Sequence, residues 1–213
     1  MKYSAILFDL DGTLIDTIPL WQKAYLQTLH DEGINMELDE FMERIYHKNE
    51  HFITIFKEFG FPEKEWERIR EDRDSRYCDL LRNNSEWIDG ALEMLNAAKV
   101  ESPIGMMTGS WKRYTDAIDE KLGIYDKFES TITCDDTQGG RSKPHPYGLE
   151  LLANKMGVEP EKCLYIGDQL FDIEAANAAG MTSCLIWQEW TPIGADENAK
   201  VVCENYEELI KQF

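Results

Sequence analysis

The sequence Ile6-Leu7-Phe8-Asp9-Leu10-Asp11-Gly12-Thr13-Leu14 joins a short apolar run to two carboxylates and a glycine. The apolar residues 5–8 predict a buried strand. Because side chains at i and i+2 of an extended chain share one face, we expect Asp9 and Asp11 to converge at the carboxyl end of this strand. Two close carboxylates repel each other unless they share a cation or a proton, which indicates a metal, acid–base chemistry, or both. The simpler alternative is a strand followed by an Asp-Gly turn.

Length and charge limit the class of protein. The chain has 213 residues, which suits one full domain or a domain with a sizeable insertion, and its formal net charge of −19 argues against nucleic-acid binding. No apolar stretch approaches the roughly 20 residues of a membrane span, and the first residues show no signal-peptide pattern. Five scattered cysteines without a CxxC pair predict reduced thiols in the core. We therefore expect a cytoplasmic protein that binds neither nucleic acid nor membrane.

Residues 17–83 follow helical spacing throughout, and nothing in them predicts a strand. Pro19 fits the first turn of a helix with Thr17 as its cap, and helical patterns cover residues 20–30, 41–46, 52–59 and 66–81. An all-helical block inserted after the first strand predicts a separate small domain. We expect an α/β core at residues 1–16 and 84–213, with the helical domain at residues 17–83.

From residue 88 onward, helices alternate with short apolar strands. We expect strands at residues 104–107, 128–133, 163–166, 183–187 and 201–202, and helices at residues 90–98, 112–122, 146–156, 171–179 and 207–212. This alternation predicts a Rossmann-like parallel sheet with helices on both faces. The long polar stretch at residues 188–199 carries no motif to which we assign a role.

A hydroxyl-containing tripeptide, Thr108-Gly109-Ser110, follows the strand expected at residues 104–107. A hydroxyl and free backbone N–H groups at the start of a helix form a site of the size of a phosphate. The alternative is an ordinary N-cap made by Ser110.

A single lysine stands before two prolines in Lys143-Pro144-His145-Pro146. The prolines should hold the chain extended around His145 and start the next helix, which fixes the direction in which Lys143 leaves the backbone. A fixed cation beside an acidic centre could bind phosphate and offset carboxylate repulsion, whereas the alternative is a solvated loop lysine. His145 is expected to be structural or to face solvent.

Two more carboxylates follow the strand expected at residues 163–166, in Gly167-Asp168-Gln169-Leu170-Phe171-Asp172. Asp168 should lie at the end of the strand and Asp172 one helical turn later, on the same side. Asp168 alone could be a helix cap. Together with Asp172 it indicates a metal ligand supported by an outer carboxylate.

These features, in this order, resemble the haloacid dehalogenase-like superfamily, in particular its phosphatase branch with a helical cap inserted after the first strand. Residues 9–17 resemble the first motif of the family, Thr108 the second, Lys143 the third, and Gly167-Asp168 with Asp172 the fourth. The run Asp172-Ile173-Glu174-Ala175-Ala176-Asn177-Ala178-Ala179-Gly180-Met181 is also similar to this branch. The resemblance covers the core from residue 1 to about residue 187.

The resemblance implies a role for each of these residues. Asp9 would be the nucleophile that forms an aspartyl-phosphate, and Asp11 the general acid and then the base that activates water. Thr108, Gly109 and Lys143 would bind the phosphoryl oxygens. Mg²⁺, or Mn²⁺ in its place, would be held by the Asp9 carboxylate, the backbone oxygen of Asp11 and Asp168, with Asp172 orienting them. The expected activity is hydrolysis of a small-molecule phosphate ester.

Other chemistries of the superfamily are alternatives. Dehalogenases lack the second aspartate and phosphonate-cleaving members replace it, so the presence of Asp11 disfavours both. Sugar phosphomutases share the cap position and metal site but carry a cap-hinge histidine where Trp21 stands. A non-catalytic regulatory protein that binds a phosphate ligand would be marked by loss of Asp9, Asp11, Lys143 or Asp168, and all four are present.

Substrate choice is expected to depend on the helical domain, which in this branch closes over the site and excludes water. The polar break containing His47, Lys48 and Asn49 is where the branch commonly places substrate contacts, and a solvated turn is the alternative. Arg44 is a further candidate, and Trp21 could pack at the hinge or line the substrate chamber. The sequence does not select among phosphoglycolate, a sugar phosphate and a nucleoside monophosphate.

Overall fold

The computed structural model describes residues 2–48, 50–137 and 140–213, apart from the side chain of His47. The described chain divides into two compact units, one formed by residues 1–16 and 86–213 and the other by residues 17–85. Each unit has its own hydrophobic core, as the clustering of its buried residues shows. None of the described helices is both long and apolar enough to cross a membrane.

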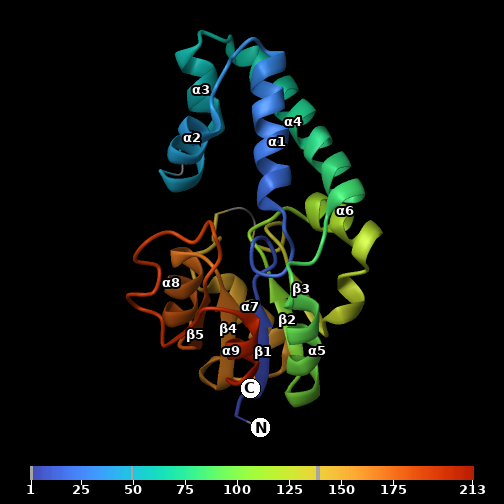
Figure 1. Ribbon diagram of the computed structural model, residues 1–213, viewed down its shortest axis with the longest axis vertical. Helices are drawn as coiled ribbons and strands as arrows, with labels where there is room; N and C mark the ends of the chain where they lie inside the picture. The colour runs from blue at the N-terminus through green and yellow to red at the C-terminus, as the bar shows by residue number, and fades with distance from the viewer. Residues whose placement is uncertain (1, 49, 138–139) are drawn as a thin grey trace. The chain divides into compact units, whose positions relative to one another are not determined.

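The first unit is built on a six-stranded sheet with the order β3-β2-β1-β4-β5-β6, in which every pairing is parallel. Because β1 lies between β2 and β4, the segments that follow these three parallel strands meet at the carboxyl-terminal ends of the strands (Figure 1). The strands are β1 (Ala5–Phe8), β2 (Ile104–Met107), β3 (Ser130–Ile132), β4 (Cys163–Gly167), β5 (Thr182–Ile186) and β6 (Val201–Cys203). The central strand β1 is buried at all its positions, as expected for a sheet covered on both faces.

Helices cover both faces of this sheet. Leu7 and Tyr165 share a core cluster with residues of α7 and α8, while their neighbours in the strands, such as Ile6 and Ile166, are buried on the opposite face. Helices α5 and α9 pack on each other. The helices of this unit are α5 (Ala91–Glu101), α6 (Lys112–Leu122), α7 (Tyr147–Met156), α8 (Leu170–Ala178) and α9 (Tyr206–Ile210), with short 3₁₀ turns at Tyr125–Lys127 and Pro160–Lys162. The predicted α/β class is confirmed.

The regular elements among the described residues of the second unit are all helices. It contains α1 (Ile18–Asp31), α2 (Leu38–Phe41), a π-helical segment (Met42–His47), α3 (Phe52–Glu58) and α4 (Glu63–Asn84). Its core is aromatic, with Phe41, Phe52 and Phe56 buried and Trp21 and Tyr25 packed against them. The π-helical segment, where Lys48 N donates to Glu43 O, replaces part of the ordinary helix predicted at residues 41–46.

Three local expectations are wrong. Thr17 stands at the N-cap position of α1, but its hydroxyl makes no capping hydrogen bond. The N-cap of α6 is Trp111 and not Ser110. Residues 143–144 form a turn with a cis peptide bond before Pro144, closed by a 2.9 Å hydrogen bond from His145 N to Ser142 O, and the chain is therefore not extended there.

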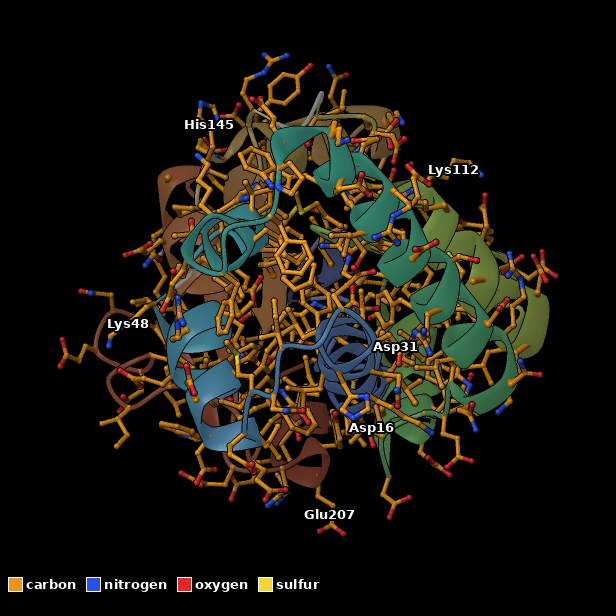
Figure 2. The ribbon with its side chains drawn as sticks, turned by 90° about the horizontal axis from the view of Figure 1, so that it is seen from above. Asp16, Asp31, Lys48, Lys112, His145 and Glu207 are labelled. Atoms are coloured by element: carbon orange, nitrogen blue, oxygen red, sulfur yellow. The ribbon has the colours of Figure 1, made fainter. Side chains whose placement is uncertain are left out.

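Two other expectations about single residues are confirmed. His145 is exposed, points outward and accepts a hydrogen bond from Tyr147 N at 3.1 Å, so its role is structural (Figure 2). The five cysteines are all buried free thiols, as their spacing predicted.

Candidate active site

The two aspartates of the first motif lie directly after β1. Asp9 continues the sheet, with its amide donating to Ile166 O at 2.9 Å, and its side chain is only 5% exposed. Asp11 receives a 2.8 Å hydrogen bond on Oδ2 from the hydroxyl of Thr108, which follows β2. The other oxygen, Asp11 Oδ1, is buried and has no hydrogen-bond partner in the described part of the chain. One carboxylate oxygen is thus held and the other is available.

Lys143 is buried between two carboxylates and does not behave as a solvated loop lysine. Its Nζ lies 2.7 Å from Asp9 Oδ1 and 2.6 Å from Asp172 Oδ1. The contact with Asp9 is an ion pair without hydrogen-bond geometry, since Asp9 Oδ1 accepts no hydrogen bond among the described residues. Nζ also donates to the hydroxyl of Tyr165 on β4 at 3.1 Å. Burial alone would lower the pKa of Lys143, but Asp172 and Asp9 raise it well above its usual range, so the side chain stays cationic.

Asp168 and Asp172 follow β4 at the start of α8. Asp168 is fully buried, and Thr13 donates to its Oδ1 at 2.6 Å. Asp172 Oδ2 accepts the backbone N–H of Gln169 at 3.0 Å, which completes a capping box at the first turn of α8. Gly167 leaves room for this arrangement, because a Cβ atom there would collide with the side chain of Asp172.

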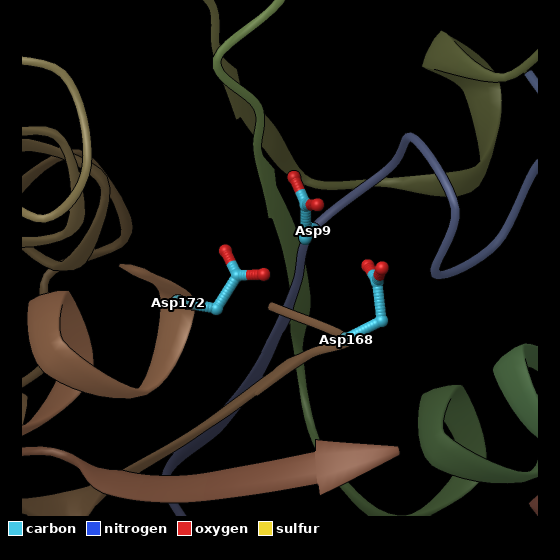
Figure 3. A group of neighbouring side chains, drawn as sticks. All are labelled: Asp9, Asp168 and Asp172. Carbon is cyan, nitrogen blue, oxygen red and sulfur yellow. The ribbon is translucent and has the colours of Figure 1, made fainter. Parts of the chain in front are cut away.

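Three carboxylates from these segments could hold a metal ion. Oxygens of Asp9, Asp168 and Asp172 lie within 4.8 Å of one another, and Figure 3 shows the three groups facing a common space. Both oxygens of Asp172 are already engaged, by Lys143 and by Gln169, whereas Asp9 Oδ1 accepts no hydrogen bond in the described residues. Hard carboxylate oxygens suit a divalent cation such as Mg²⁺. Asp9 therefore fits direct coordination better than Asp172 does.

Burial and mutual repulsion raise the pKa of these acids. The pKa of Asp9 is held well above its usual value by burial, against the opposing effect of Lys143. Burial, and then Asp172, raise the pKa of Asp168 to about 7, while hydrogen bonds from Thr13 and Gln169 act in the opposite direction. Carboxylates crowded in this way gain most from a bound cation, because the cation removes the repulsion that disfavours their ionised forms.

The segment after β2 presents part of an anion site. Gly109 is exposed, and a Cβ atom there would have open space around it. The backbone N–H of Ser110 is not free to bind an anion, because it donates to Thr108 Oγ1 at 3.0 Å. This bond orients the Thr108 hydroxyl toward Asp11. The one proton of the Thr108 hydroxyl is thus donated to Asp11, and a contact of Thr108 with a phosphoryl group stays a prediction.

The residues of the helical unit that were predicted to contact substrate differ in their packing and exposure. Trp21 packs against Tyr25, Phe41 and Tyr46, with ring centroids 4.8, 4.9 and 5.8 Å away. Lys48 points outward and pairs with Glu43 at 2.8 Å (Figure 2). The side chain of His47 and the whole of Asn49 lie outside the described residues.

Arg44 is fully engaged by acids. It contacts Glu40, Glu50 and Glu58 at 3.4, 2.8 and 2.5 Å. A guanidinium with three carboxylate partners has little charge left for a phosphate, so Arg44 is a weaker candidate for substrate binding than Lys48.

Three residues near the carboxylates carry contacts that the motifs did not indicate. Thr13 donates to Asp168, and Tyr165 hydrogen-bonds both Lys143 and, at 3.1 Å, Met107 O. Trp190, from the stretch without a motif, donates from its indole Nε1 to Asp168 Oδ2 at 2.9 Å. Thr13 could have been noted for its place in the first motif, whereas no sequence signal pointed to Tyr165 or Trp190.

A parallel sheet with acids at the carboxyl ends of its central strands and a buried lysine defines a Rossmann-like enzyme site. The model of the haloacid dehalogenase-like hydrolase family matches residues 3–180, and the chain belongs to that family.

Known relatives include phosphatases. The chain is 31% identical over 189 residues to N-acetylmuramic acid 6-phosphate phosphatase of Pseudomonas aeruginosa, covering 87% of this chain and 82% of the relative. It is 30% identical over 200 residues to phosphoglycolate phosphatase of Escherichia coli, covering 84% and 79%. The fold is similar to CbbY from Rhodobacter sphaeroides, crystallised in complex with phosphate, with a TM-score of 0.82, 20% identity and coverage of 97% and 96%.

Proposed function

We propose that this protein is a magnesium-dependent phosphatase that hydrolyses a small-molecule phosphate monoester through an aspartyl-phosphate on Asp9. The observation that carries the proposal is the buried ion pair of Asp9 with Lys143, 2.7 Å apart, beside the carboxylate of Asp168. Such a pair combines a nucleophile with a cation that can stabilise a phosphoryl group during transfer. The assignment of the α/β unit to the chemistry and of the helical unit to substrate choice belongs to the same proposal.

In the first half-reaction, an oxygen of Asp9 bonds to phosphorus while the bond between phosphorus and the ester oxygen breaks. The departing oxygen takes a proton from Asp11, whose second oxygen is held by Thr108. In the second half-reaction, Asp11 removes a proton from water, the water oxygen bonds to phosphorus, and Asp9 is released. Lys143 compensates the charge on the phosphoryl oxygens in both steps.

The proposed metal ligands are the carboxylates of Asp9 and Asp168 and the backbone oxygen of Asp11. Asp172 orients them through its bonds to Lys143 and Gln169. When bound, Mg²⁺ would polarise the phosphoryl oxygens and reduce their repulsion with Asp9. The donor set consists of oxygen alone, which matches the preference of this cation.

The substrate belongs to the class of small phosphate monoesters. The relatives named above act on N-acetylmuramic acid 6-phosphate and phosphoglycolate, so both compounds should be included in any panel. Trp21 favours hydrolysis over phosphate transfer between sugar hydroxyls, because an indole cannot shuttle a proton as the hinge histidine of mutases does.

The test is release of p-nitrophenol from p-nitrophenyl phosphate by the purified full-length chain, with MgCl₂ and with a chelator. We expect turnover with Mg²⁺ and its loss with the chelator, followed by selection of the best ester from a panel of metabolite phosphates. Absence of turnover with either Mg²⁺ or Mn²⁺ would contradict the proposal. Interconversion of sugar phosphates without net phosphate release would instead identify a mutase.

A further inference from the structure

Trp190 lies in the polar stretch after β5, beyond the residues matched by the family model. Its indole Nε1 donates a 2.9 Å hydrogen bond to Oδ2 of Asp168. An indole Nε1–H can only donate a hydrogen bond, so its partner must be an acceptor, and here it is a carboxylate oxygen. The contact joins a loop residue to a proposed metal ligand.

A network of hydrogen bonds fixes the loop that carries this indole. Gln188 N donates to Thr191 Oγ1 at 3.0 Å, and Thr191 N donates to Gln188 O at 3.1 Å, which closes a tight turn around residue 190. The side chain of Gln188 donates to the hydroxyl of Tyr206 at 2.8 Å, and this hydroxyl donates to Thr13 O at 2.8 Å. The turn is therefore attached to α9 and to the loop after β1, which orients Trp190 before any ligand binds.

The carboxylate of Asp168 is surrounded by neutral donors. Thr13 donates to Oδ1 at 2.6 Å, and Gln169 and Trp190 donate to Oδ2 at 2.5 and 2.9 Å. Neutral donors orient a carboxylate and leave its negative charge available to a cation. Since an ionised carboxylate accepts about four hydrogen bonds, these three leave a lone pair for a metal.

The indole also packs against the backbone of the loop that carries the nucleophile. Gly12 has a φ of +78°, and a Cβ atom there would lie 2.7 Å from Trp190 Nε1 and 3.1 Å from Asp168 Oδ2. The space that a side chain at position 12 would need is thus occupied by the hydrogen bond between Trp190 and Asp168. Trp190 connects the segments after β1 and β4, which supply the proposed metal ligands.

We propose that Trp190 is a positioning residue for the metal site, which holds the carboxylate of Asp168 in the orientation that binds Mg²⁺. The inference rests on the proposed function, because it assumes that Asp168 is a metal ligand. Donors to metal-binding groups are commonly worth 10- to 100-fold in metal affinity.

The test compares Trp190→Phe with Trp187→Phe by calorimetric titration of the full chain with MgCl₂ alone. Phenylalanine retains an aromatic body and removes the N–H donor. Trp187 lies in the same segment but packs in an apolar cluster with Ile173 and Leu185, which makes it a matched control. We expect Trp190→Phe to weaken Mg²⁺ binding about tenfold and Trp187→Phe to change it by less than about twofold.

A second measurement on the unaltered protein does not depend on the folding of any variant. The chain has six tryptophans, so the indole N–H region of its ¹H–¹⁵N spectrum can be assigned by triple-resonance methods. We expect the Trp190 Nε1–H resonance to shift during a MgCl₂ titration with the same midpoint as the calorimetric binding curve. An unmoved resonance would show that bound Mg²⁺ does not act on the hydrogen bond between Trp190 and Asp168.

Three outcomes would overturn the inference. If Trp190→Phe binds Mg²⁺ within about twofold of the unaltered protein while Asp168→Asn loses binding, Trp190 has no positioning role and the proposed function stands. If the Trp190 resonance does not respond to bound Mg²⁺, the same conclusion follows. If the unaltered protein binds no Mg²⁺, the proposed metal site fails together with this inference.

Discussion

The hydroxyl of Thr108 donates a 2.8 Å hydrogen bond to Oδ2 of Asp11, although the two residues lie 97 positions apart in the sequence. The bond occupies one oxygen of Asp11 and leaves Oδ1 without a hydrogen-bond partner among the described residues. A carboxyl group held in this way has a fixed direction for proton transfer. This geometry separates the role of Asp11 from that of Asp9, which pairs with Lys143.

The first prediction concerns Asp11→Asn. An asparagine cannot protonate a leaving oxygen or deprotonate water, so we expect turnover of alkyl phosphates to fall by about 10²- to 10⁴-fold. p-Nitrophenolate leaves with little need for a proton, so formation of the aspartyl-phosphate from p-nitrophenyl phosphate should survive better than its hydrolysis. Rapid-quench kinetics should show a burst of p-nitrophenol equal to the enzyme concentration. Equal losses for both ester types, without a burst, would refute the role of Asp11.

The second prediction concerns Asp9→Asn. An amide of the same shape cannot attack phosphorus, and we expect kcat to fall by at least about 1,000-fold while the circular dichroism spectrum stays unchanged. The exposed Asp196→Asn in the same unit is the control and should retain full activity. Residual activity within about tenfold of the unaltered enzyme would exclude Asp9 as the nucleophile.

The third prediction concerns the stability contributed by Lys143. Lys143→Met keeps the length of the side chain but leaves Asp9 and Asp172 without their cation, and breaking a buried pair of this kind costs about 3–5 kcal/mol. Urea denaturation should show this loss at alkaline pH and a smaller loss as the pH falls, because Asp9, whose pKa is raised, then takes up a proton and no longer needs a cation. Lys155→Met, which removes a surface pair with Asp136, should cost less than about 1 kcal/mol. Equal losses for the two variants would contradict the burial of this charge.

The fourth prediction concerns pH and Mg²⁺. The pKa of Asp168 is raised to about 7 from a usual value of 3.8, so the metal-free folded chain holds this proton more tightly than the unfolded chain does. The stability contributed by this group is present below pH 3.8 and is lost as the pH rises toward 7. Because Mg²⁺ binds the ionised form, the increase in Tm caused by MgCl₂ should be larger at about pH 8 than at about pH 5.5. Asp168→Asn should remove this difference, and a difference that persists would place the metal elsewhere.

The fifth prediction concerns substrate choice by the helical unit. Lys48 is exposed and forms a surface ion pair with Glu43, which leaves its ammonium accessible to a phosphate group. Lys48→Ala should therefore lower kcat/KM for the preferred ester several-fold, mainly by raising KM. The control is Lys64→Ala, which removes an exposed lysine from α4 of the same unit. Unchanged kcat/KM across a panel of phosphate esters would eliminate Lys48 as a substrate contact.

The sequence predicted those parts of the fold and site that depend on local patterns. The strand at residues 104–107 and the helix at residues 112–122 were predicted with their exact bounds, because apolar runs and turn residues mark both ends. The approach of Asp9 to Asp168 followed from placing each acid at the end of a parallel strand. Such inferences need only the periodicity of the chain and the direction of the sheet.

Features that depend on the packing of distant side chains could not be predicted in this way. Trp190 donates to Asp168 from a turn that Gln188 attaches to Tyr206, and neither Trp190, Gln188 nor Tyr206 belongs to a recognisable motif. Free backbone N–H groups were expected after the strand at residues 104–107, but that of Ser110 donates to the Thr108 hydroxyl two residues before it. Thr17 has the right residue type and position for a cap, yet its hydroxyl makes no such bond. The residue type determines which hydrogen bonds a side chain can form, and the surrounding structure determines which of them it does form.

The hydrogen bond from Tyr206 to the carbonyl oxygen of Thr13 has a consequence for biosynthesis. Translation produces the nucleophile well before Tyr206, so the segment after Asp9 gains its contact with Tyr206 only once residue 206 has left the ribosome. The strand β1, which Asp9 directly follows, is central in the sheet and can pair with β4 only after residues 163–167 have been synthesised. A nascent chain should therefore carry the reactive aspartate without being able to use it until β4 and then Tyr206 have emerged from the ribosome.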